Sequence, residues 1–182
     1  MSRASEPLSA AASAGASADA AAAVEAAELP PYIVEQIERL APRYPTREAL
    51  LLPALHLAQR HWGGWLPDAA IAAVARALEL PLSSVYGVVT FYDLFHQKPV
   101  GRHRIRVCTN LSCQIRGSAE IMETLRQELG VGEEEVTPDG RCSYVHFECL
   151  GSCDTAPMMM VDDDYRENLT PAKVRDILRG LK

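Results

Sequence analysis

The stretch HRIRVCTNLSC, residues 103–113, separates two parts of the chain that have different patterns. Its first six residues, 103–108, alternate and contain β-branched side chains, which predicts a β-strand that ends on a cysteine. A second cysteine, Cys113, follows after four intervening residues. Pro99 and Gly101 stand just upstream and predict a boundary there, so a second domain is expected to begin near residue 100.

Downstream of this stretch the pattern predicts a small mixed domain. A helix is expected from Ser118, its predicted cap, to Gly130, which suits a left-handed C-terminal cap. Strands are predicted at residues 143–148 and 158–161, and Thr170 followed by proline is a strong start for a last helix. The order β-α-β-β-α is compatible with a small sheet covered by helices, of the thioredoxin-like kind.

Upstream, residues 30–95 have a helical pattern without useful strand-like alternation, and three or four short helices are expected. Thr46 is the predicted cap of the second helix, in which Pro53 marks either a kink or a late start, because proline removes a helical hydrogen bond. Another helix should open at Pro67.

The last helix of this part is predicted over residues 82–95. Ser83 or Ser84 is its expected cap, and the side chains expected on its buried side include Tyr92 and Phe95. The helix is expected to end before Pro99.

The fold class expected from these patterns is α+β, with an N-terminal helical bundle before the mixed domain. The domains are expected to span 1–29, 30–98 and 99–182. The first of these is rich in Ala and Ser, carries one Arg and several acidic residues, and has no large apolar run. It is interpreted as a flexible tail rather than a transit or secretory signal.

The composition of the chain restricts the classes of function. A formal net charge of -6 disfavours a nucleic-acid partner, because phosphate binding needs a concentrated basic face. No apolar run approaches the roughly 20 residues that cross a bilayer, so no direct membrane insertion is expected. Five cysteines without an export signal favour thiolates kept reduced in the cytosol, and therefore metal ligation, over a disulfide framework.

Four cysteines form two pairs, Cys108 with Cys113 and Cys149 with Cys153, and each pair is predicted to follow a strand in a loop. Two such loops can converge at one edge of a sheet. A [2Fe-2S] cluster takes four thiolates, two for each iron, which matches two pairs. Structural zinc also accepts four cysteines and stays a possibility at this point, as do buried free thiols or disulfides.

The remaining candidates are interpreted as structural. Cys142 is expected at the start of a strand, outside the site, because free cysteine commonly packs as a small hydrophobe. The acidic run 162–164 predicts a solvated turn, and methionines 158–160 predict core filling. Backbone N–H groups near Gly151 and Ser152 are expected to point at sulfur and to tune the site. The five histidines lie at no metal spacing with the cysteines, and nucleotide-binding motifs are absent from the sequence.

The motifs resemble those of one family, the peripheral [2Fe-2S] subunits of respiratory NADH:quinone oxidoreductase (complex I), which are thioredoxin-like ferredoxins. The likeness spans about residues 31–182. It rests on the segments Val85-Tyr-Gly-Val-Val-Thr-Phe-Tyr92, Pro99-Val-Gly101, Cys108-Thr-Asn-Leu-Ser-Cys113 with Gly117, Glu148-Cys-Leu-Gly-Ser-Cys-Asp-Thr-Ala-Pro157, and Tyr165 to Leu181.

This resemblance implies a thioredoxin-like [2Fe-2S] ferredoxin domain in which Cys108, Cys113, Cys149 and Cys153 ligate one cluster. It implies a non-autonomous part of an enzyme that exchanges single electrons with FMN, where FMN and the NADH site belong to a partner flavoprotein of a multi-subunit complex. The chain would be cytoplasmic, peripheral on the inner membrane through that complex. Related subunits serve NAD-reducing hydrogenases and NAD-dependent formate dehydrogenases; a zinc-stapled assembly adaptor and a free-standing ferredoxin are the alternatives of another class.

Overall fold

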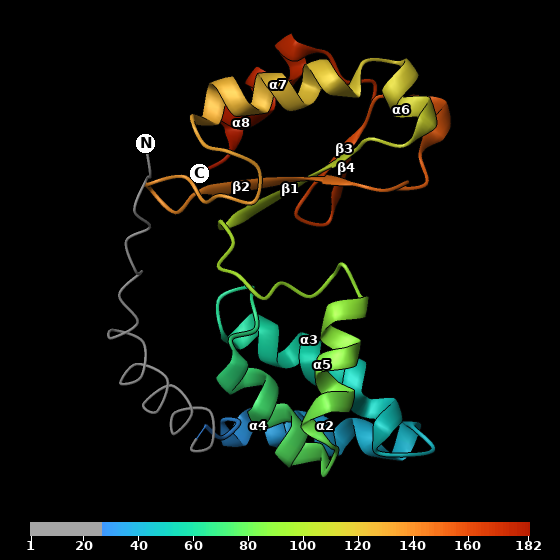
Figure 1. Ribbon diagram of the computed structural model, residues 1–182, viewed down its shortest axis with the longest axis vertical. Coiled ribbons are helices and arrows are strands. Elements are labelled where there is room, and N and C mark those ends of the chain that lie inside the picture. Colours follow the sequence, from blue (N-terminus) through green and yellow to red (C-terminus); the bar gives the residue numbers. More distant parts are fainter. Residues whose placement is uncertain (1–26) are drawn as a thin grey trace, which may run out of the picture. The chain divides into compact units, whose positions relative to one another are not determined.

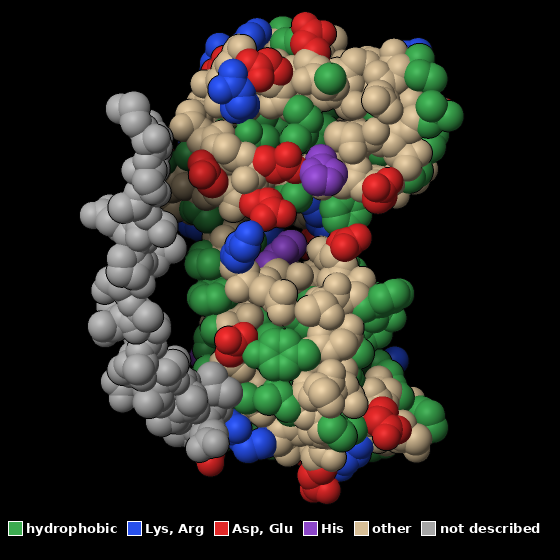
Figure 2. All heavy atoms as spheres, in the orientation of Figure 1, with side chains coloured by type: hydrophobic (Ala, Val, Ile, Leu, Met, Phe, Trp, Pro, Cys, Tyr) green, Lys and Arg blue, Asp and Glu red, His purple; other side chains and the backbone are tan. Residues whose placement is uncertain are grey.

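The computed structural model describes residues 27–182. These residues form two compact units, which divide between Gln97 and Lys98, and each unit is described by itself. Most of the tail expected over 1–29 lies outside the described residues. Within the described part, every helix is too short or too polar to cross a membrane. On the face drawn in Figure 2, Lys and Arg side chains are interspersed with Asp and Glu.

The first unit is helical, as expected. Its helices are α2 (Pro31–Leu40), α3 (Leu51–His61), α4 (Asp68–Leu78) and α5 (Leu82–Phe91), with 3-10 turns at Ala41–Arg43 and Glu48–Leu50. Neighbouring helices pack on one another around a single apolar core that includes Ile33, Leu55, Ile71 and Val85. Each of these side chains is at most 1% exposed, so the apolar stripes account for the packing.

Pro53 marks a late helix start and not a kink. Helix α3 begins at Leu51, which places Pro53 in its first turn, where the missing N–H is not needed. The hydroxyl of Thr46 accepts a hydrogen bond from the Ala49 backbone N–H at 3.3 Å. The N-cap of α3 is Leu50, and no side chain caps that helix, so the expected cap by Thr46 is wrong.

Helix α5 differs from the expectation at both ends. Pro81 occupies the N-cap position and no side chain caps the helix, so the expected cap by Ser83 or Ser84 is wrong. The helix ends at Phe91, because Tyr92 is already extended, with φ −97° and ψ 117°. Phe95 is buried as expected, whereas Tyr92 is 39% exposed. The apolar residues beyond Phe91 follow no helical stripe because the chain there is irregular.

The second unit is a four-stranded sheet with helices (Figure 1). Its elements are β1 (His103–Cys108), α6 (Leu111–Ile115), α7 (Ser118–Leu129), β2 (Cys142–Phe147), a 3-10 turn η3 (Cys153–Thr155), β3 (Met159–Val161), β4 (Asp164–Arg166) and α8 (Pro171–Gly180). The strand order is β2-β1-β3-β4. Helices α7 and α8 both lie on one face of the sheet in Figure 1.

Strand register places the core of this unit. β1 runs parallel to β2 and antiparallel to β3, and β3 pairs antiparallel with β4. Alternate residues of β1, Ile105 and Val107, point toward the helices and pack with Ile121 and Leu125 of α7 and with Val174 of α8. Because side chains alternate across a strand, Arg104, Arg106 and Cys108 belong to the opposite face.

Two elements of this unit were not expected from the sequence. The five-residue helix α6 carries Cys113, so the expectation that this cysteine lies in a loop is wrong. The three-residue strand β4 continues the sheet beyond β3. Both are too short to produce a recognisable hydrophobic period. The predicted capping role of Ser118 is also wrong, since Gly117, with φ 99°, occupies the N-cap of α7. Gly130 ends that helix in the left-handed conformation, as expected.

Asp162 and Asp163 form a turn as expected, whereas Asp164 already begins β4. Asp162 is not simply solvated. Asp162 accepts a hydrogen bond from the Arg104 backbone N–H at 2.9 Å and lies 2.8 Å from His103 Nδ1. The hydrogen bond with the Asp162 carboxylate is the main cause that raises the pKa of His103, and a hydrogen bond with the Lys182 main-chain oxygen adds to it. Burial and the charge of Arg102 act in the opposite direction. Asp162 thus connects the β3–β4 turn to the start of β1.

This contact predicts a pH-dependent contribution to stability. A histidine whose pKa is raised on folding stabilises the fold fully below its unfolded pKa of about 6.5, and that contribution is lost as pH rises through the folded value. The free energy of unfolding in urea should therefore differ more between the wild type and H103N at pH 5.5 than at pH 8.5, by at most about 1 kcal/mol for a partly exposed pair. A difference that is the same at both pH values would contradict this assignment.

Candidate metal centre

The two cysteine loops begin at the same edge of the sheet. β1 and β2 are parallel, and the last residue of β1, Cys108, is paired in register with Phe147, the last residue of β2. Cys149 follows two residues later. Parallel strands deliver the segments after their carboxyl ends to one edge, so the convergence of the two loops expected from the sequence is confirmed.

The first cysteine pair is buried. Cys108 is 3% exposed and Cys113 is 1% exposed, and both pack against Ala156 and Met158 in a small apolar cluster. Burial is the main cause that raises the pKa of Cys113 to about 11, and a hydrogen bond with the Cys108 thiol adds to it. Metal ligation needs the thiolate form, so a metal that binds here must displace protons from these thiols.

The second pair faces solvent. Cys149 and Cys153 are both exposed, and their sulfur atoms lie 3.5 Å apart. Two thiolates on one tetrahedral ion, with metal–sulfur bonds of about 2.3 Å, are separated by roughly 3.8 Å. The hydrogen bond with Cys149 raises the pKa of Cys153, and a hydrogen bond with the Ser112 side chain has the opposite effect. The second pair therefore has the spacing of two ligands to one ion.

The two pairs belong to one region. Helix α6, which carries Cys113, packs against η3, which begins at Cys153. Cys153 is close enough to interact electrostatically with both Cys108 and Cys113. All five cysteines are free thiols. Over residues 27–182, no three His, Cys, Asp or Glu side chains surround a single point as ligands of one metal ion would. The donor set is thus two thiol pairs side by side, which fits the two-per-iron ligation of a [2Fe-2S] cluster.

Polar side chains that sequence reasoning missed connect the first loop to the second. Asn110 caps α6 by accepting a hydrogen bond from the Leu111 backbone N–H, and its amide donates to the Glu148 carboxylate at 3.0 Å. Arg116 Nε donates to the Ala156 carbonyl at 3.2 Å. The capping tendency of asparagine was the available signal for α6. Its contact with Glu148 joins residues 38 apart, which no local pattern indicates.

The second loop is held by residues that follow it. Gly151 adopts φ 86°, a left-handed conformation that lets the chain turn between the two cysteines. The Ser152 hydroxyl donates to the Glu167 carboxylate and lies 2.7 Å from the Thr155 hydroxyl oxygen. Tyr165 of β4 donates its hydroxyl proton to the Leu150 carbonyl at 2.5 Å. The unexpected strand β4 therefore supports the loop directly.

Cys142 lies away from the other four cysteines. It begins β2, is fully buried in the core under the helices, and is paired with His103 at the opposite end of β1 from Cys108. Five residues of strand separate the two positions by about 17 Å. Met158 and Met159 are at most 1% exposed, so their expected role as core filling is confirmed, whereas Met160 is only partly buried.

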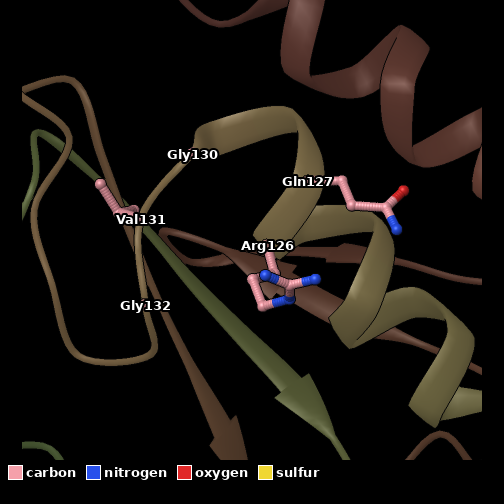
Figure 3. Close-up of a pocket in the computed structure, with 5 residues that line it drawn as sticks. All are labelled: Arg126, Gln127, Gly130, Val131 and Gly132. Atoms are coloured by element: carbon pink, nitrogen blue, oxygen red, sulfur yellow. The ribbon is translucent and has the colours of Figure 1, made fainter.

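A pocket lies at the C-terminal end of α7 (Figure 3). It has a volume of about 400 Å³ and is lined by Arg126, Gln127, Gly130, Val131 and Gly132. Figure 3 shows the Arg126 and Gln127 side chains leaving the helix in different directions. Both already donate hydrogen bonds to the Glu123 carboxylate, at 2.7 to 2.8 Å. The polar groups of this pocket are therefore engaged within the helix.

The family model for thioredoxin-like [2Fe-2S] ferredoxins matches residues 37–182. The chain belongs to this family. The family has a thioredoxin-like fold and one [2Fe-2S] cluster, so the fold class and the cofactor expected from the sequence are confirmed. The paired thiols at one sheet edge are the donor set that such a cluster needs, and among the other described residues no comparable set of thiols occurs.

Curated relatives extend the likeness over most of the chain. The E subunit of NADH-quinone oxidoreductase from Rickettsia bellii is 46% identical over 147 residues, which are 80% of this chain and 88% of the relative. An E subunit of NADH-quinone oxidoreductase from Rhizobium meliloti is 40% identical over 81% of this chain and 88% of its own length. The resemblance drawn from the sequence motifs is thereby confirmed.

A solved structure of a NAD+-reducing [NiFe]-hydrogenase in the air-oxidized state is also similar. It has a TM-score of 0.60 and 25% sequence identity, and the match covers 71% of this chain. The matched part is 22% of the hydrogenase chain, so this chain corresponds to about a fifth of that larger one.

Proposed function

We propose that this chain is the electron-transfer subunit of a NADH:quinone oxidoreductase and holds one [2Fe-2S] cluster on Cys108, Cys113, Cys149 and Cys153. The observation that carries the proposal is the convergence of these two thiol pairs in a chain that is 46% identical to a NADH-quinone oxidoreductase component. As one part of a complex, it contributes to an oxidoreductase without a complete active site of its own. Its partners are the other subunits of that multi-subunit complex.

The two thiol pairs differ in solvent exposure, so the two sides of the site differ in their access to the surface. A bound [2Fe-2S] cluster takes up or releases one electron. Cys108 and Cys113 close the inner side with Met158, which keeps water from that side, while Cys149 and Cys153 are exposed. The exposed pair provides the shortest path from the site to the surface. We infer that electrons are exchanged through this side with the FMN of a NADH-oxidising flavoprotein partner.

The location follows from the partners. The described residues contain no membrane-crossing helix, so this chain would reach the membrane only through other subunits. We place it on the cytoplasmic side of the inner membrane as a peripheral part of that complex.

The cofactor assignment has a direct test in the full-length chain. Anaerobically purified protein should be brown and contain about two irons per chain, and reduction with dithionite should give a rhombic EPR signal from one [2Fe-2S] cluster. Colourless protein with stoichiometric zinc would instead favour a zinc-stapled assembly adaptor and overturn the proposal.

The hydrogenase is the second candidate complex, because its solved structure shares the fold of this chain at 25% identity. A formate dehydrogenase remains an alternative through the sequence motifs alone. Deleting the gene should remove NADH:quinone oxidoreductase activity from membranes, and the wild-type gene should restore it. Loss of NAD-linked hydrogen or formate oxidation, with NADH:quinone activity intact, would assign the chain to one of the other complexes.

A further inference from the structure

The carboxylate of Glu167 lies against the loop that carries the exposed cysteine pair. Ser152 donates its hydroxyl proton to Glu167 Oε1, and Thr155 Oγ1 donates to the same oxygen at 2.9 Å. The two hydroxyls also contact each other at 2.7 Å. Glu167 is separated from these residues by at least 12 positions in sequence, so the contact joins two distinct segments of the chain.

Main-chain bonds fix Glu167 relative to the loop. Asn168 donates its N–H to the Thr155 carbonyl at 2.7 Å, and Leu169 donates to the Pro157 carbonyl at 2.9 Å. Lys173 of α8 donates to the Glu167 carbonyl. The segment that follows β4 therefore runs beside the end of the cysteine loop and is itself tied to α8, which gives the carboxylate a rigid support.

We propose that Glu167 holds the Cys149–Cys153 loop in the conformation that ligates the cluster, and that its negative charge lowers the reduction potential of the cluster. In the sequence, Cys153 lies between Ser152 and Thr155, the two residues whose hydroxyls bind Glu167. Holding both of these residues therefore also holds Cys153 in place. The inference rests on the proposed ligation by Cys149 and Cys153. Glu167 acts through the loop and is a positioning residue.

The charge of Glu167 is maintained by the same contacts. The hydrogen bonds from Ser152 and then Thr155, with the nearby Lys173, hold the pKa of this carboxyl below its usual range, so it is ionised at neutral pH. An anion close to a redox centre disfavours the reduced form, which is the more negative of the two. Partners of ligand-bearing loops tune metal sites in this way as well as orienting them.

Two variants separate the anchor from the charge. E167Q keeps the size and an acceptor oxygen but loses the charge, whereas E167A removes both. The matched control is E128Q, which removes the same charge from α7, where Glu128 pairs with Arg175 at 2.8 Å near the end of α7 that is remote from Gly117. Far-UV circular dichroism and thermal melting of all three full-length proteins establish that they fold.

In the cluster-loaded chain, E167Q should retain the EPR line shape and shift the midpoint potential to a higher value. E167A should lose its cluster to a chelator about 10 to 100 times faster than the wild type, the range typical of outer-shell substitutions. E128Q should match the wild type in both measurements. An unchanged midpoint in E167Q, or an equal shift in E128Q, would overturn the electrostatic role.

Amide hydrogen exchange in the cluster-free chain tests the anchor independently of any metal. Residues 149–155 should exchange about tenfold faster in E167A than in the wild type and E128Q, with E167Q between them. Equal exchange in all four proteins would overturn the anchoring role. If the wild type bound zinc instead of iron, the proposed function and the electrostatic role would both fail, while the exchange rates would still decide whether Glu167 orders the loop.

Discussion

Replacing any one of Cys108, Cys113, Cys149 or Cys153 with alanine is expected to abolish stable cluster assembly, whereas C142A should keep it. Each of the four sulfurs belongs to a pair at one sheet edge, and Cys142 lies at the other end of the strands. Alanine is chosen because a serine hydroxyl can still ligate iron. Iron per chain should fall at least about tenfold, since even outer-shell changes weaken metal sites by 10 to 100 times.

Iron content, visible absorption and the EPR signal of the reduced protein measure this result. C142A removes a fully buried sulfur from the core, so it should cost stability through the cavity it leaves and yet bind a normal amount of iron. Loss of the cluster in C142A together with its retention in C153A would contradict the assignment of the ligands.

The second large effect is expected at Gly101. A Cβ atom at this position would lie 2.3 Å from the Cys142 carbonyl carbon and 2.5 Å from the Ser143 nitrogen, both of which are backbone atoms that cannot rotate away. The Gly101 N–H also donates to the Ser143 hydroxyl at 3.0 Å. G101A must therefore displace the start of β2 or its own segment, at a cost of about 1–3 kcal/mol or more in the free energy of unfolding.

Urea unfolding of the cluster-free chain measures this cost, and G180A is the matched control. Gly180 is the last residue of α8, and a Cβ there would meet no atom within 4 Å. Because alanine favours a helix over glycine by up to about 1 kcal/mol, G180A should be neutral or stabilising. Equal unfolding free energies for G101A and the wild type would show that the close approach at Gly101 is not tight in solution.

Local pattern accounts for the longer elements. The apolar stripes of α4, α7 and α8, the alternation of β1 and the left-handed cap at Gly130 all depend on residues within a few positions of one another. The cap by Thr170 is of the same kind, since its side chain accepts a hydrogen bond from the Lys173 N–H. Such features can be predicted from the sequence because they arise from helix and strand periodicity and from short-range hydrogen bonds.

Local sequence was enough to predict the two cysteine pairs, the strands that precede them and the place of Cys142 near the start of a strand. Three features became visible only in the folded chain: the short helix α6 that carries Cys113, the extension of the sheet by β4, and the hydrogen bonds that Ser152 and Thr155 donate to Glu167. The physical reason is the length scale of each feature. Elements of three to five residues show no period, and a hydrogen bond between distant segments exists only after the strands have brought those segments together.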